Sequence, residues 1–196
     1  MPRLFIALDL PDDIKDSLLD LAMPLPATRW QGGDQLHLTL RFLGEVDPGR
    51  IAPLTRALET VDVAPFAIQL KGLGHFPPRG EPRVLWVGVE GREPLERLRR
   101  AVSAALDEVG VDYERRKFTP HVTIARIAAP LPTNRLASFL TKRSLFRSES
   151  FLPPSFSLYQ SFLRPGGAEY HAIATYPLVP DFDGLDDDGA DDVAEE

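Results

Sequence analysis

The order strand, amphipathic helix, strand occurs twice along this 196-residue chain, and the last strand of each copy carries the pattern His-Xaa-Thr. In the first copy, an apolar run at residues 3–9 is followed by a helical pattern and by the alternating segment 36–42. In the second copy, residues 83–89 precede a helix over 94–110 and the segment 118–126. A repeat of this kind predicts an α+β fold with two similar lobes facing one another across a central cleft.

We expect each lobe to contain an antiparallel sheet with flanking helices, and both lobes to belong to one domain over residues 1–180. The repeat divides this domain into residues 1–80 and 81–180, a division that also allows the lobes to exchange their terminal strands. Further expected elements are a helix over 47–60, a strand over 66–70, a short helix after Thr133 and a hairpin of segments 155–163 and 169–178.

The formal charge of −7 is concentrated at the end of the chain. Residues 181–196 hold nine of the 29 acidic residues and none of the 22 basic ones, so residues 1–180 carry 22 basic and 20 acidic side chains. The acidic segment has too little apolar surface to offset its ordering entropy, which predicts a disordered, solubilising tail. The alternative is an autoinhibitory segment that mimics a polyanionic partner. The slightly basic remainder is compatible with a phosphate-bearing partner.

Several classes of protein are disfavoured by what the sequence lacks. It contains no cysteine, which excludes disulfides, thiolate nucleophiles and thiolate metal sites. The apolar run at residues 3–9 is too short for a signal or membrane helix, so we expect a cytoplasmic protein without a membrane partner, and a monomer. Neither a His-Xaa-His pair nor a glycine-rich nucleotide loop is present, so we expect no metal and no cofactor.

The two His-Xaa-Thr segments are the candidate catalytic site. In a strand, alternate side chains share a face, so His37 lies beside Thr39, and His121 lies beside Thr123. Opening a cyclic phosphate needs a base that takes a proton from water and an acid that protonates the departing oxygen, and imidazole suits both roles. Hydroxyls beside the rings suit the phosphoryl oxygens. One such motif is weak evidence, whereas two copies at equivalent places of a repeat favour a catalytic pair.

With these motifs, the chain resembles the two-histidine phosphoesterase superfamily and, within it, the RNA 2′,3′-cyclic phosphodiesterases, also called 2′-5′ RNA ligases. The similarity extends to about residue 180. Its main segments are Arg3-Leu4-Phe5-Ile6-Ala7-Leu8-Asp9-Leu10-Pro11, Leu36-His37-Leu38-Thr39-Leu40-Arg41-Phe42-Leu43-Gly44, Gly72-Leu73-Gly74 with Phe76-Pro77, Pro120-His121-Val122-Thr123-Ile124-Ala125-Arg126 and Leu158-Tyr159-Gln160-Ser161.

This resemblance implies a bilobal α+β fold and hydrolysis of a terminal 2′,3′-cyclic phosphate to a 2′-phosphomonoester, with a reversible 2′-5′ ligation that needs no ATP. It implies that His37 donates a proton to the leaving 3′ oxygen, that His121 activates water, and that Thr39 and Thr123 bind the phosphate. The implied partner is RNA or a nucleotide with a 2′,3′-cyclic phosphate end.

Other residues rank below these four. Arg126 is a candidate phosphate ligand, but it lies three positions beyond Thr123 and so faces away unless the strand bends or ends there. Phe76 is a candidate platform for the terminal base. The remaining candidates are expected to be structural or exposed unless they line the cleft: Trp30, His75, Arg115, Arg116, Lys117, Tyr159 and His171.

Two other functions remain open from the sequence. One is a phosphodiesterase that acts on 2′-5′ oligonucleotides or on small cyclic nucleotides. The other is an RNA-binding module without turnover, against which the presence of both histidines argues, because binding alone does not require a matched acid and base.

Overall fold

A computed structural model describes residues 1–164 and 167–178, and it has the α+β architecture expected from the sequence. The acidic segment 181–196 lies outside the described residues. The helices are α1 (Asp12–Leu19), α2 (Pro48–Glu59), α3 (Arg92–Glu108), α4 (Thr133–Lys142) and the 3-10 turn η1 (Gly33–Gln35). The strands are β1 (Arg3–Leu8), β2 (Thr28–Trp30), β3 (Leu38–Glu45), β4 (Ile68–Phe76), β5 (Val84–Glu90), β6 (His121–Ile127), β7 (Arg147–Phe151), β8 (Ser155–Arg164) and β9 (Gly167–Pro177).

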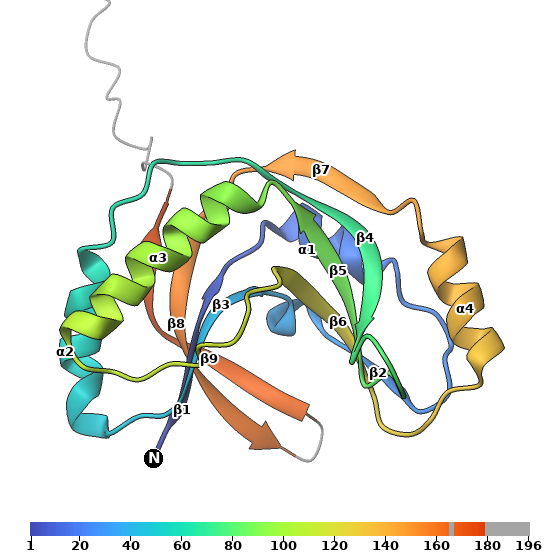
Figure 1. Ribbon diagram of the computed structural model, residues 1–196, viewed down its shortest axis with the longest axis horizontal. Helices are drawn as coiled ribbons and strands as arrows, with labels where there is room; N and C mark the ends of the chain where they lie inside the picture. Colours follow the sequence, from blue (N-terminus) through green and yellow to red (C-terminus); the bar gives the residue numbers. More distant parts are fainter. Residues whose placement is uncertain (165–166, 179–196) are drawn as a thin grey trace, which may run out of the picture.

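The strands form one antiparallel sheet in the order β7-β4-β5-β6-β3-β1-β8-β9, and β2 pairs with β6 beside this path. In Figure 1 the sheet curls, with β1, β3, β8 and β9 on one side and β4 to β7 on the other. The two sides meet where β3 and β6 pair through Leu38 and Val122. Each side contains strands from both halves of the sequence, because β4 lies between β5 and β7, while β8 pairs with β1.

The local sequence explains the main elements. Strand β1 is apolar without alternation because Leu4 to Leu8 are all buried, so both of its faces are covered. Asp47 caps helix α2, because its carboxylate accepts a hydrogen bond from the backbone N–H of Gly49 at 2.7 Å. Helix α3 buries Leu95, Leu98, Val102, Ala105 and Leu106 along one face.

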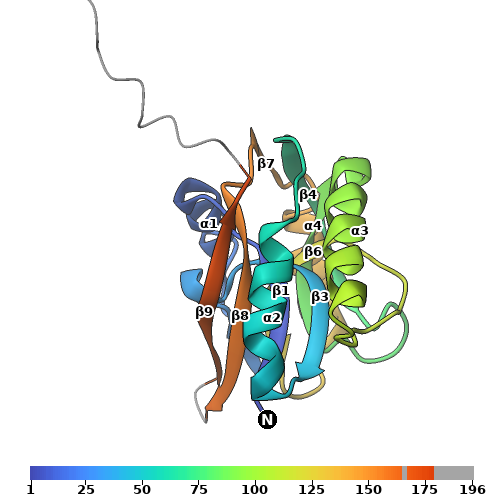
Figure 2. The same ribbon diagram turned by 90° about the vertical axis from the view of Figure 1, so that its left-hand side faces the viewer.

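Helices α2 and α3 lie side by side, and α4 lies at the far end of the sheet (Figures 1 and 2). The Arg50 guanidinium of α2 donates to the carbonyl oxygens of Val109 and Gly110, just beyond α3, which fastens these helices to one another. The buried apolar residues of both sides of the sheet form one continuous core.

Some boundaries differ from those expected. The strand expected over 36–42 begins at Leu38, so His37 precedes it, and the strand expected over 66–70 continues to Phe76 through two glycines. At Gly74 the absent side chain leaves room for the indole of Trp86, which a Cβ would overlap. The sequence does not predict strands β2 and β7, because they are short and each gains its stability from one pairing partner.

Candidate active site

Both His-Xaa-Thr motifs lie where the two sides of the sheet meet. Leu38 and Val122, the middle residues of the motifs, pair across β3 and β6 and are fully buried. Continuing this antiparallel register places His37 opposite Thr123 and Thr39 opposite His121. All four of these side chains line one cavity of about 650 Å³, the central cavity. The structure therefore brings together the four residues that the sequence ranks first.

The two imidazoles are held in the same way. Nδ1 of His121 lies 2.7 Å from the carbonyl oxygen of Thr119, and the ring of His37 forms a hydrogen bond with the backbone of Gln35. Each partner is therefore two residues before its histidine. A carbonyl oxygen only accepts, so Nδ1 of His121 must carry the proton, which leaves Nε2 of the neutral ring as an acceptor.

Burial lowers the pKa of both imidazoles. It brings the pKa of His37 down to about 4, with smaller contributions from the nearby charges of Arg126 and His121. The pKa of His121 is also lowered, mainly by burial and in part by Arg116. Since both rings are neutral near pH 7 in the free protein, each can accept a proton, and an anionic ligand would favour the protonated form.

Aromatic rings fix the position of His37. Phe5 lies against it at a centroid distance of 4.9 Å and stacks on Tyr159 at 5.2 Å, while the edge contact of Tyr170 closes another side at 5.1 Å. The Tyr159 hydroxyl donates to Asp9 at 2.5 Å, and burial followed by this contact raises its pKa. Tyr159 thus supports Phe5 and is not among the residues lining the central cavity.

A bulge in β6 explains how Arg126 reaches the cavity. Leu85 of β5 pairs with Ala125, whereas its neighbour Trp86 pairs with Thr123, so Ile124 is an extra residue in β6. A regular strand would turn Arg126 away from the cavity, and this bulge supplies the bend that the sequence analysis requires for Arg126 to reach it. Ile124 and Ala125 are both buried, and Arg126 lines the central cavity beside Thr123.

The other motif strand has a matching bulge. In the pairing of β1 with β3, Leu40 is an extra residue, as is Leu43 farther along the strand, and both Leu40 and Arg41 are buried. Phe42 is thereby brought to the same side as Thr39, at the position equivalent to Arg126. The sequence does not single out Phe42, because a bulge cannot be recognised from the alternation pattern alone.

A second hollow of about 540 Å³ adjoins the central cavity and shares His121, both threonines and Arg126 with it. Phe76 lines only this second hollow, and its ring contacts His121 edge-on at 5.0 Å. Further residues of the central cavity that sequence reasoning missed are Arg3, Arg29, Gln31, Gln35, Arg164 and Tyr170. They come from segments far apart in the chain, and no local motif marks them.

The remaining candidates lie elsewhere or have structural partners. Trp30 packs edge-on against Phe139 at 5.5 Å and donates from Nε1 to the Met23 carbonyl, as expected of a packing residue. His75 belongs to β4, and its Nδ1 lies 2.8 Å from the Pro77 carbonyl oxygen. His171 is exposed on β9. Of the basic run, Arg116 lines both hollows.

In the part of the chain that the structure describes, no three His, Asp or Glu side chains gather in a way that could hold a metal ion. None of the helices in residues 1–164 and 167–178 has the length and apolar character needed to cross a membrane.

Curated proteins and solved structures resemble this chain over most of its length. An RNA 2′,3′-cyclic phosphodiesterase of Geobacillus stearothermophilus is 36% identical over 94% of this chain, which spans 60% of that protein. One of Archaeoglobus fulgidus is 34% identical over 89% of this chain and 99% of its own length.

Among solved structures, a protein of Thermus thermophilus superposes with a TM-score of 0.75 at 28% identity, covering 90% of this chain and 97% of the other. Escherichia coli LigT in apo form does so with a TM-score of 0.70 at 27% identity, covering 90% and 97%. The family model described as the 2′-5′ RNA ligase superfamily matches residues 21–159, which include both motifs. The chain therefore belongs to the 2′-5′ RNA ligase superfamily.

Proposed function

We propose that this protein is an RNA 2′,3′-cyclic phosphodiesterase that hydrolyses a terminal 2′,3′-cyclic phosphate to a 2′-phosphomonoester. The observation that carries the proposal is the placement of both motif histidines and both motif threonines around one cavity. The relatives from G. stearothermophilus and A. fulgidus, which carry this name, support the same substrate class.

In the proposed reaction, Nε2 of His121 takes a proton from water as the water oxygen bonds to phosphorus. The bond from phosphorus to the 3′ oxygen breaks, and His37 gives its proton to that oxygen. The phosphate remains on the 2′ oxygen, and the reaction consumes one water molecule. His37 starts protonated and His121 neutral, so proton exchange with solvent resets the pair.

Positioned donors complete the site. The hydroxyls of Thr39 and Thr123 are suited to the phosphoryl oxygens, on which negative charge increases as water attacks. The guanidinium of Arg126 supplies a permanent positive charge on the same side of β6, which adds charge-assisted hydrogen bonding. Phe76 offers a ring next to His121 for a base.

Ligation uses a 5′ hydroxyl in place of water: His121 takes its proton as its oxygen bonds to phosphorus, the bond to the 3′ oxygen breaks, and His37 protonates that oxygen, which leaves a 2′-5′ linkage. No ATP is needed because the strained cyclic diester supplies the driving force. The roles of the two histidines exchange when the 3′ hydroxyl attacks this linkage and re-forms the cyclic phosphate. We propose this ligation as a second activity of the same site, which the name of the superfamily supports.

The test is product analysis with an RNA that ends in a 2′,3′-cyclic phosphate. We expect a product that carries its phosphate on the 2′ oxygen and resists enzymes specific for 3′ phosphates. Formation of a 3′-phosphate would show attack with the opposite leaving group. No turnover of any cyclic-phosphate RNA, with binding retained, would favour the RNA-binding module instead.

A further inference from the structure

The second hollow reaches Arg99 of α3. Its lining includes Arg41, Arg99 and Lys117, which do not line the central cavity. It is called the Arg99 groove below, and its lining includes Arg99, Arg116, Lys117 and Phe118. Its one acidic lining residue is Glu114, which is paired with Arg116 at 3.1 Å. The groove therefore carries a marked excess of positive charge.

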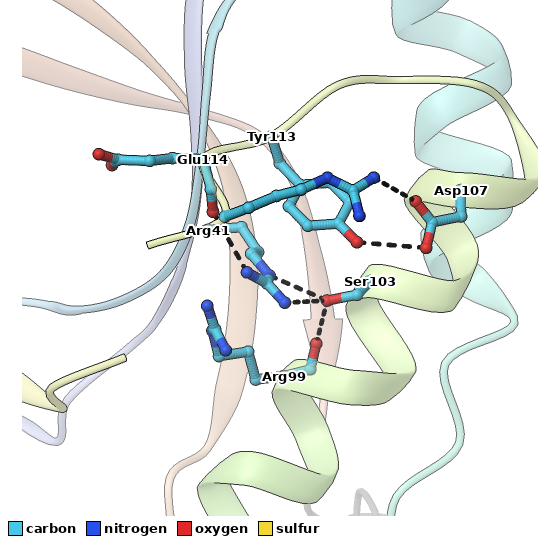
Figure 3. Close-up of polar contacts among 7 residues, drawn as sticks. Arg41, Arg99, Ser103, Asp107, Tyr113 and Glu114 are labelled. Atoms are coloured by element: carbon cyan, nitrogen blue, oxygen red, sulfur yellow. Dashed lines mark hydrogen bonds and ion pairs between the residues drawn. The ribbon is translucent and has the colours of Figure 1, made fainter. Parts of the chain in front are cut away.

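Two of its cations, Arg41 and Arg99, are held by polar groups and aromatic rings instead of by carboxylates. Arg41 is buried, and its guanidinium donates to Ser103 Oγ and to the Glu114 carbonyl oxygen, as Figure 3 shows. Arg99 donates to the Leu40 carbonyl oxygen at 3.3 Å. Over residues 1–164 and 167–178, no ion pair joins Arg41, Arg99 or Lys117 to an acidic side chain.

The positive charges of Arg41 and Arg99 disfavour each other. Burial lowers the pKa of Arg99, and burial together with the charge of Arg99 lowers the pKa of Arg41, because neighbouring cations disfavour each other. Asp107, whose carboxylate is drawn in Figure 3, is instead bonded to Tyr113 and Arg115. An anion entering the groove would relieve this repulsion.

The groove also presents aromatic faces. Phe42 is 45% exposed, which is unusual for a phenylalanine, and it lies between the central cavity and the groove. The Arg116 guanidinium lies 6.0 Å above its ring, and that of Arg99 lies 4.6 Å above Phe118. Basic grooves with exposed aromatic rings are typical of single-stranded nucleic acid sites.

We propose that the Arg99 groove binds the nucleotide on the 5′ side of the cyclic-phosphate end, with its phosphate near Arg99 and Lys117 and its base on Phe42. The inference rests on the proposed function, which places the cyclic phosphate at the histidines where both hollows meet. On the other side, Arg164 is paired with Glu169, and Arg29 lies against Gly167. The preferred substrate is therefore an oligonucleotide, with its chain running toward α3.

The test compares kcat/KM for a cyclic-phosphate oligonucleotide with that for a cyclic mononucleotide. In the double variant Arg99→Gln/Lys117→Gln, we expect the ratio of the two values to fall roughly tenfold. For the oligonucleotide, the slope of log kcat/KM against log salt concentration should become shallower by about 0.7 for each phosphate that the variant no longer neutralises. Lys117→Gln alone changes an exposed side chain, so it gives a smaller effect of the same sign in a folded protein.

Two control variants separate this groove from general electrostatics. Arg135→Gln/Lys142→Gln removes the same charge from exposed positions on α4 and should leave the ratio unchanged. Arg3→Gln changes a cation that lines the central cavity but not the groove. An equal fall of the ratio with either control variant, or an unchanged ratio in the Arg99→Gln/Lys117→Gln variant, would overturn the inference.

A binding assay tests the inference separately from the proposed function. If the wild type hydrolyses neither substrate, the proposed function fails. Fluorescence anisotropy with a labelled single-stranded RNA that ends in a 3′-phosphate still measures the groove. Weaker binding in Arg99→Gln/Lys117→Gln, with Arg135→Gln/Lys142→Gln unchanged, supports it, and equal binding by wild type and both variants refutes it.

Discussion

Leu38 is paired with Val122, and this contact between β3 and β6 sets the two histidine motifs next to each other. Because both leucine and valine point into the core, the flanking histidines and threonines are directed to the opposite, open side. This pair of apolar residues thus sets the two histidines and the two threonines around one cavity, and the predictions below depend on that arrangement.

Replacing either histidine should abolish most turnover. His37→Ala and His121→Ala are each expected to reduce kcat about 10²–10⁴-fold on a 2′,3′-cyclic phosphate, the usual contribution of a general acid or base. Circular dichroism should show an unchanged fold. His171→Ala, at an exposed position on β9, is the matched control and should retain full activity. Losses of only a few-fold in both motif variants would refute the paired-imidazole mechanism.

The threonine hydroxyls should act on the phosphate. Thr39→Val and Thr123→Val keep the shape of the side chain but remove a donor from the central cavity. We expect each to lower kcat/KM by up to about 10²-fold, as for other donors to a developing oxyanion. Thr39→Ser and Thr123→Ser retain the hydroxyl and should keep most activity, and a valine variant as active as its serine counterpart would contradict this role.

The pH dependence of activity should be displaced toward acid. Burial holds the pKa of His37 at about 4 and lowers that of His121 from 6.5. Since hydrolysis needs His37 protonated and His121 neutral, we expect a bell-shaped profile of kcat/KM with both limbs below pH 6.5. The alkaline limb of kcat should lie higher, because bound phosphate favours the imidazolium. A profile of kcat/KM that rises through pH 8 would be incompatible with this pair.

The stability of the folded protein should depend on pH through the imidazole of His37. The folded-state pKa of His37, about 4, lies below its ordinary value of 6.5, so only the unfolded chain binds this proton between those values. The neutral ring therefore contributes stability that is present above pH 6.5 and is lost as the pH falls toward 4. As the pH is lowered from 6.5 to 4, the free energy of unfolding measured with urea should fall less in His37→Asn than in the wild type, by at most about 3 kcal/mol. Parallel pH curves would contradict this.

Activity should survive chelation. In the proposed reaction, side chains of this chain perform both proton transfers and hold the phosphate. We therefore expect kcat/KM to be the same after dialysis against EDTA as before, within error. A strict requirement for an added divalent cation, restored by titration with the metal, would show that an ion performs part of this work.

Periodicity and motif spacing were sufficient to predict the α+β class, the helices expected over 47–60 and 94–110, which span 48–59 and 92–108 in the structure, the hairpin after Ser155 and the placement of each motif histidine beside its threonine. These features depend on neighbours in the sequence: alternation places His37 with Thr39, and a 3.6-residue period places Leu95 with Leu98. Such information is local, and a single chain contains it in full.

What only the tertiary structure decided is which distant groups share the site. The bulges at Leu40 and Ile124 arise from pairing with β1 and β5, and they turn Phe42 and Arg126 toward the cavity against the expected alternation. Arg99 joins the same surface because α3 packs beside β3, 59 residues away from its partner Leu40. Register and packing are set by contacts between segments far apart in sequence, so no pattern within one segment can specify them.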